Sequence, residues 1–74
     1  MTWKEIEKIM KGRYDVIVEV NRDKNKYFMK KDNVHYKLNS CQFDKLLEGG
    51  WIDPDYRIER NALFGYERHI YEGR

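Results

Sequence analysis

Cys41 is the only cysteine in this chain of 74 residues, so no internal disulfide can hold its fold together. A chain of this length buries only about 60% of the surface that its unfolded state exposes. Its stability must therefore come from one small hydrophobic core, which leaves little interior to enclose a deep catalytic cavity. We expect a single domain over residues 1–74 that works through its surface.

The segment MTWKEIEKIMKG predicts a helix over about residues 2–11. Thr2 followed by Glu5 is the capping-box pattern of a helix start. Apolar side chains then recur on one face at helical spacing, at Trp3, Ile6, Ile9 and Met10. Gly12 is expected to end the helix in the left-handed conformation.

A second helix is predicted over about residues 40–48, because Asn39 and Ser40 are both good N-caps. Its apolar stripe consists of Phe43, Leu46 and Leu47. The glycine pair 49–50 is expected to end it, and residues 51–52 stand where an apolar contact commonly folds back on the last helical turn. We expect this contact to pin the helix to its own core.

Five segments predict β-strands, at residues 14–20, 26–31, 34–38, 56–60 and 65–71. Asp32 and Asn33 tolerate the positive φ of a tight hairpin turn. The alternation of the last strand is compatible with two registers, which place either Tyr66, Arg68 and Ile70 or Glu67, His69 and Tyr71 on the inner face. The element order α-β-β-β-α-β-β predicts an α+β domain in which two helices pack on a small antiparallel sheet.

The last two strands are the candidate protein-binding surface. Tyr, Trp and Arg side chains dominate the binding energy of protein interfaces, and this segment is rich in tyrosine and arginine. The candidate contact residues are Tyr56, Arg57, Arg60, Leu63, Phe64, Tyr66, Arg68 and Tyr71. Leu63 and Phe64 stand at the loop tip NALFG, where Phe64 either contacts a partner or folds under as part of the core.

The alternative is nucleic-acid binding through the basic region 22–37. Residues 1–37 hold ten Lys/Arg and six Asp/Glu, whereas residues 38–74 hold five and seven. The candidate contacts are Lys24, Lys26, Phe28, Lys30, Lys31, His35 and Lys37. The lysines would attract phosphates, and Phe28 and His35 would stack on bases. However, Asp15 and Glu19 are expected on the same face and would neutralise lysines across the strands.

The α-β-β-β-α order resembles the double-stranded-RNA-binding domain in topology. The second helix of that family opens with lysines aimed at phosphates. Here the corresponding stretch NSCQFDK holds a single lysine, Lys45, beside Asp44. Small toxin ribonucleases of similar layout carry a histidine in the second strand, and KYFMKK has none. A winged-helix protein would need a helix-turn-helix that the chain does not provide. The resemblance therefore implies an element order and no function.

No catalytic, metal or cofactor site is predicted. Cys41, His35 and His69 are far apart in the sequence and do not have the spacing of a zinc site. A pair formed by Cys41 and His35 is conceivable, but no glycine-rich loop accompanies it. We therefore expect a protein that is not an enzyme.

The sequence as a whole predicts a non-catalytic interaction protein that occupies a surface of a larger protein partner, such as a nucleic-acid-binding protein. The lysine-rich, alanine-poor composition suggests an AT-rich coding source, and proteins this short are often accessory or inhibitory factors of phages and mobile elements. We expect no membrane association, and a cytoplasmic location because no apolar leader follows Met1. An unprotected edge strand could also pair with a second copy of the chain.

Overall fold

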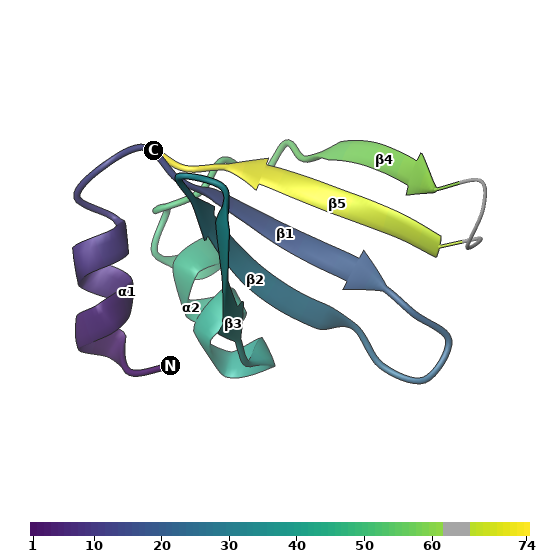
Figure 1. Cartoon of the computed structure of the whole chain (residues 1–74), viewed down its shortest axis with the longest axis horizontal. Helices are drawn as coiled ribbons and strands as arrows, with labels where there is room; N and C mark the ends of the chain where they lie inside the picture. The colour runs from purple at the N-terminus through teal and green to yellow at the C-terminus, as the bar shows by residue number, and fades with distance from the viewer. Residues whose placement is uncertain (62–65) are drawn as a thin grey trace.

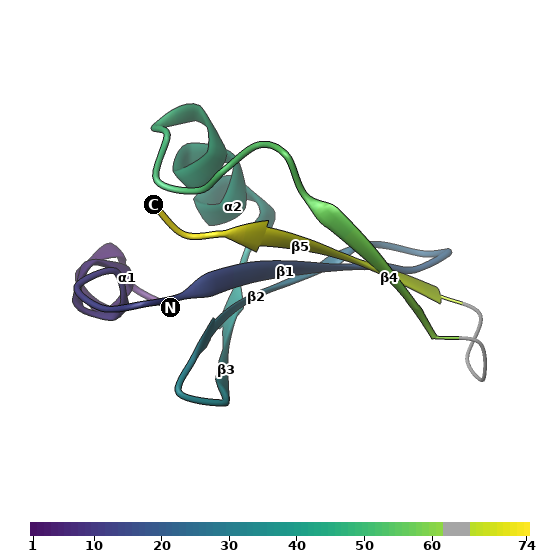
Figure 2. The ribbon, with the colours of Figure 1, turned by 90° about the horizontal axis from the view of Figure 1, so that it is seen from above.

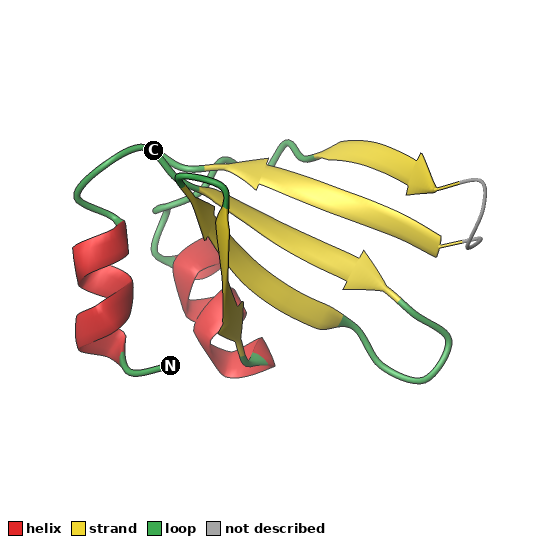
Figure 3. Ribbon diagram, in the orientation of Figure 1, coloured by secondary structure: helices red, strands yellow, loops and turns green. Residues whose placement is uncertain are grey.

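The computed structural model describes residues 1–61 and 66–74 (Figure 1). These residues form seven elements, in chain order α1 (Trp3–Ile9), β1 (Asp15–Val20), β2 (Lys26–Lys31), β3 (Val34–Leu38), α2 (Ser40–Glu48), β4 (Arg57–Asn61) and β5 (Tyr66–Glu72). The α+β class and the α-β-β-β-α-β-β order are confirmed (Figure 3). The predicted bounds of β2, β3 and α2 are those of the structure.

The five strands form one antiparallel sheet in the order β3-β2-β1-β5-β4. The first three strands form an antiparallel meander. The last strand, β5, pairs with β1 on one side and with β4 on the other, so it lies inside the sheet. The edges of the sheet are therefore β3 and β4.

One face of the sheet carries the helices, and we call it the helix face. Its central side chains pack in one core with Ile6 and Ile9 of α1 and Phe43 and Leu46 of α2. The strand residues of this core are Val16, Val18, Met29, Leu38 and Tyr71. Both helices gather at the end of the sheet where β1 begins (Figures 1 and 2). The opposite end, which includes the β1–β2 turn, projects beyond them.

The other face of the sheet, which we call the open face, has no helix on it. In the register of the strands, Phe28, Ile17 and Ile70 stand side by side across β2, β1 and β5. Ile17 and Ile70 are buried all the same. The positions around them carry long charged side chains, whose aliphatic stems can cover apolar neighbours. The open face therefore holds a narrow apolar row between charged flanks.

The helix ends follow the sequence with two exceptions, at Gly12 and in the capping box of α1, where the Glu5 side chain accepts the Thr2 hydroxyl and not the Thr2 N–H. Asn39 caps α2 in a complete capping box with Gln42, and the Thr2 side chain accepts the Glu5 N–H in α1. The prediction for Gly12 is wrong, because Gly12 does not adopt a positive φ. The N–H groups of Lys11 and Gly12 instead bond carbonyls three residues back, which satisfies the last turn without a left-handed residue.

The end of α2 is pinned to the core as predicted. Gly50 has a φ of +76°, and the N–H groups of Gly50 and Trp51 donate to the carbonyls of Leu47 and Leu46. This is the Schellman arrangement, in which a left-handed residue closes the helix. The ring of Trp51 then meets the ring of Trp3 edge-on, with centroids 5.4 Å apart, so the turn also fastens α1.

A short strap joins the segment after α2 to the last residues of the chain. Ile52, which is fully buried, forms an isolated bridge with Gly73. The Tyr14 hydroxyl donates to the carbonyl of Trp51, and the Gly73 N–H donates to the carbonyl of Tyr14 at 3.0 Å. We call these contacts the 52–73 strap. They bring the beginning of β1, the end of α2 and the end of β5 together.

Replacing Gly73 by alanine should destabilise the fold. A Cβ at this position would lie 2.6 Å from both the ring and the carbonyl oxygen of Tyr14. Overpacking of this kind is expected to lower the free energy of unfolding by about 1–3 kcal/mol, measured by urea denaturation. Gly12→Ala is the matched control, since its Cβ would meet only the flexible end of Lys31. Equal free energies of unfolding for the two variants would contradict the close packing of Gly73 against Tyr14 in the 52–73 strap.

The stability of the fold should decline in alkali through Tyr71. Burial, with smaller contributions from Tyr56 and Tyr27, raises the pKa of Tyr71 above its ordinary value of 10.0. The unfolded chain then ionises this tyrosine at a lower pH than the folded chain does. The contribution of the neutral Tyr71 side chain to the free energy of unfolding is therefore complete below pH 10. It is lost as the pH rises through the higher pKa that Tyr71 has in the folded state. Tyr71→Phe should reduce the loss of stability above pH 10, measured by urea denaturation at several pH values; an unchanged loss would contradict the prediction.

Candidate interaction surface

The outer side of β4 is the exposed edge of the sheet on which the candidate surface is built. β4 pairs with β5 only, so the backbone groups on its other side face outward with no strand partner among the described residues. Such groups readily pair with another chain. We call residues 56–60, which run along this side, the β4 edge.

Two apolar side chains of the β4 edge lie on the helix face beyond the reach of the helices. Ile58 is 50% exposed and Tyr56 is 43% exposed. The ring of Tyr56 stacks on His69 with centroids 4.5 Å apart and planes at 16°, and it also contacts the buried ring of Tyr71 at 5.0 Å. Tyr56 is therefore held in place, and Ile58 stands exposed on the same face two residues further along the chain.

The charges of the β4 edge are of both signs and lie at the surface. Arg57 pairs with Glu72 at 3.3 Å, and Arg60 pairs with Glu67 at 3.4 Å. In the described part of the chain, Glu59 has no basic side chain within ion-pair distance. Exposed ion pairs contribute little to stability, so these arginines can turn to another partner at low cost.

The predicted protein-contact residues do not form one surface. Tyr56 and Arg60 lie on the helix face, as does Tyr71, which is buried in the core. Arg57 and Arg68 lie on the open face, and so does Tyr66. The predicted residues Leu63 and Phe64 lie outside the described residues. Three of the eight candidates, Tyr56, Arg57 and Arg60, belong to the β4 edge.

Sequence reasoning left Ile58 and Glu59 out of the candidate surface. Both belong to β4, and they point to opposite faces of the sheet, as neighbours in a strand do. Their exposure follows from the place of β4 at the sheet edge, which depends on β5 pairing with β1. An apolar residue flanked by charges in a short strand was the only signal in the sequence.

The predicted nucleic-acid contacts are dispersed over the molecule. Lys24 lies in the β1–β2 turn, and Lys31 points to the helix face next to Gly12. The remaining candidates share the open face, namely Lys26, Phe28, Lys30, His35 and Lys37. Asp15 stands directly opposite Lys30 there, and Glu19 stands opposite Lys26, as expected. Acidic and basic groups therefore alternate across this face.

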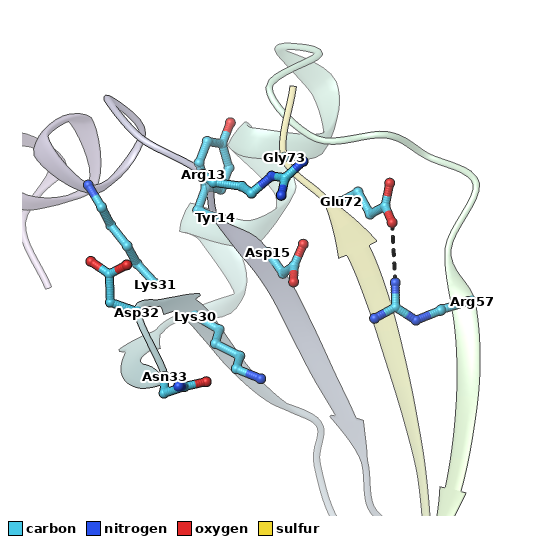
Figure 4. Close-up of a pocket in the computed structure, with 10 residues that line it drawn as sticks. All are labelled: Arg13, Tyr14, Asp15, Lys30, Lys31, Asp32, Asn33, Arg57, Glu72 and Gly73. Atoms are coloured by element: carbon cyan, nitrogen blue, oxygen red, sulfur yellow. Dashed lines mark hydrogen bonds and ion pairs between the residues drawn. The ribbon is translucent and has the colours of Figure 1, made fainter.

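A hollow of about 600 Å³ lies at the end of the sheet where β1 begins and β5 ends (Figure 4). Its basic lining comes from Arg13, Lys30, Lys31 and Arg57, and its acidic lining from Asp15, Asp32 and Glu72. Arg57 and Glu72 neutralise each other across it, and Lys31 extends away towards α1. This mixture of charges selects neither an anion nor a cation.

The described residues do not place Cys41 and His35 on the same side of the sheet, and they include no candidate metal site. Cys41 is exposed in the first turn of α2, while His35 lies on the open face with its ring edge-on to Phe28. No group of three or more His, Cys, Asp or Glu side chains in the described residues could hold a metal ion. The helices of the described chain are also too short and too polar to cross a membrane.

Comparison of the chain with protein-family models, with curated proteins and with solved structures finds no match.

Proposed function

We propose that this protein is a non-catalytic interaction protein that binds an extended segment of a larger protein along the β4 edge. The observation that supports the proposal is the exposure of Ile58 on an edge strand that lacks an outer partner. An extended segment added to such an edge gains main-chain hydrogen bonds, and its alternate side chains give specificity. By occupying a partner in this way, the protein would act as an accessory or inhibitory factor.

The side chains of the β4 edge define the chemistry of the bound segment. An apolar side chain opposite Ile58 would cover it and the neighbouring ring of Tyr56. On the open face, a basic side chain would compensate Glu59, and an acidic one would meet Arg57. We therefore propose a segment with one central apolar residue between charges of opposite sign.

A reducing, cytoplasmic setting is part of the proposal. Cys41 is exposed and has no second cysteine with which to pair inside the chain. A free surface thiol is best tolerated where disulfides do not form. An extract of the host cytoplasm is accordingly the source in which to look for the partner.

Ile58→Lys should abolish binding of the partner without unfolding the protein. The residue is half exposed, so a lysine is tolerated in the free state, whereas the bound state would bury its charge. Losing the apolar contact alone should weaken the affinity by about tenfold or more. The test captures host proteins on the immobilised protein after nuclease treatment, and then measures the affinity of the purified partner by calorimetry.

Val34→Lys is the matched control. Val34 is 48% exposed and also lies on an edge strand, β3, at the other side of the sheet. Capture that survives Val34→Lys and fails with Ile58→Lys supports the proposal; equal capture by both variants contradicts it. Capture that is lost on nuclease treatment and falls steeply between about 50 and 200 mM salt would instead identify a nucleic-acid-binding protein.

A further inference from the structure

We infer that the β4 edge also pairs with the β4 edge of a second copy of the chain, in one antiparallel register centred on Ile58. This self-pairing goes beyond the proposed function, because it uses the same edge but requires only that the outer side of β4 is open. The two-fold dimer would continue the sheet across the interface. Its physical basis is the order of side chains along residues 56–60.

In a two-fold antiparallel pair of β4 strands, the two copies can present their helix faces on the same side of the sheet. The two-fold axis must then pass between two copies of the same residue, which is the centre of the register. Each residue then stands opposite the one equally far from the centre in the other copy. Centred on Ile58, the pair places Ile58 against itself on the helix face. On the open face it places Arg57 opposite Glu59 of the second copy, and this contact occurs twice. Opposite charges in direct cross-strand positions stabilise a sheet.

The same register gives Tyr56 a partner. It stands opposite Arg60 of the second copy on the helix face, again twice. A guanidinium over a tyrosine ring is attracted by the ring's negative face. Arg60 is well exposed and its ion pair with Glu67 is a surface one, so its side chain is free to reach the ring.

The neighbouring registers are unfavourable. Centred on Arg57, the pair would set two arginines against each other. Centred on Glu59, it would set two glutamates against each other and Ile58 against Arg60. Like charges directly opposite destabilise a sheet. Among the registers centred on residues 57, 58 and 59, charge therefore selects the one centred on Ile58.

The other edge of the sheet lacks this complementarity. The side chains of β3 include one permanently charged residue, Lys37, and no acid. Every register of β3 with itself therefore lacks an opposite-charge pair, and one sets Lys37 against Lys37. A lysine on an edge strand is a common protection against pairing. Self-pairing is accordingly expected at the β4 edge and not at the β3 edge.

The dimer should be weak and sensitive to salt. β4 has five residues, and an interface of one short strand falls below the roughly 1,200 Å² of a stable complex. Arg57 already bonds Glu72, but a guanidinium has five N–H donors and can serve both carboxylates. A partner protein that occupies the β4 edge would compete with the second copy, so self-pairing would limit binding at high concentration.

Complementary charge variants test the register directly. Arg57→Glu makes both positions acidic, and Glu59→Arg makes both basic, so each variant should self-associate about ten- to a hundredfold more weakly than the wild type. An equimolar mixture of the two should recover the dimer, because every contact then joins opposite charges. The double variant R57E/E59R should recover it too. Sedimentation equilibrium at about 50 mM salt, where screening is modest, measures all of these.

Two controls separate the contact from effects within the chain. Glu72→Gln removes the intramolecular pair of Arg57 and should leave the dimer intact. In a Cys41→Ser background, Ile58→Cys should form a disulfide-linked dimer on oxidation, whereas Val34→Cys should not. Thermal melts confirm that each variant is folded.

A wild type that stays monomeric at all concentrations overturns the inference, as does a mixture of R57E and E59R no more associated than either alone. A dimer that survives Ile58→Lys overturns it as well, because it uses another surface. If association fails in these ways while Ile58→Lys still abolishes capture of the host partner, the self-pairing is wrong and the proposed function stands. If association behaves as expected but capture does not depend on Ile58, the proposed function is wrong.

Discussion

The bridge between Ile52 and Gly73 is the contact on which the rest of the arrangement depends. It places the segment after α2 beside the end of β5, and the backbone of Tyr14 holds that same end next to the beginning of β1. Because β5 is fastened there, it runs antiparallel to β1 in the interior of the sheet. The preceding strand, β4, can then pair only on the far side of β5. The exposed edge is thus a consequence of the strap.

The small core explains why the β4 edge remains uncovered, and also why it is ordered. The helices pack at one end of the sheet, and α1 and α2 have seven and nine residues, too few to reach its far side. A series of ring contacts nevertheless runs from the core to the edge, through Phe43, Tyr71 and Tyr56. Tyr56 is therefore positioned by buried neighbours, and a contact residue held in advance loses less entropy on binding.

Local signals in the sequence predicted the elements well. The positive φ of Asp32 and Asn33, the N-cap of α2 and the bounds of β2 and β3 depend on interactions between residues close in the chain. The prediction of a left-handed conformation at Gly12 was wrong, because the last turn of α1 closes with hydrogen bonds between residues three apart and needs no left-handed residue. The order of the elements along the chain was sufficient to predict the α+β fold class.

Only part of the candidate surface could be predicted from the sequence, for a physical reason. β5 carries aromatic or aliphatic residues in both alternating sets, so composition could not decide which set faces the helices. The pairing of β5 with β1 joins segments about 50 residues apart and decides that question. Before this pairing is known, the sequence suggests that Tyr71 is a contact residue, although Tyr71 is buried. It likewise gives no reason to place Ile58 at an exposed edge.

The difference between the two sheet edges bears on how such a small protein avoids uncontrolled assembly. If β4 could pair equally well with β3 of another copy, each added copy would leave one edge of each kind exposed, and the sheet would grow into a fibre. The β3 edge offers no acid to Arg57 or Arg60, and its single charged side chain, Lys37, can make only one opposite-charge contact, with Glu59, whereas β4 paired with itself makes two. Pairing of β4 with itself uses both β4 edges and leaves only β3 at the two ends. The charge pattern therefore directs association towards a closed dimer and away from an open chain.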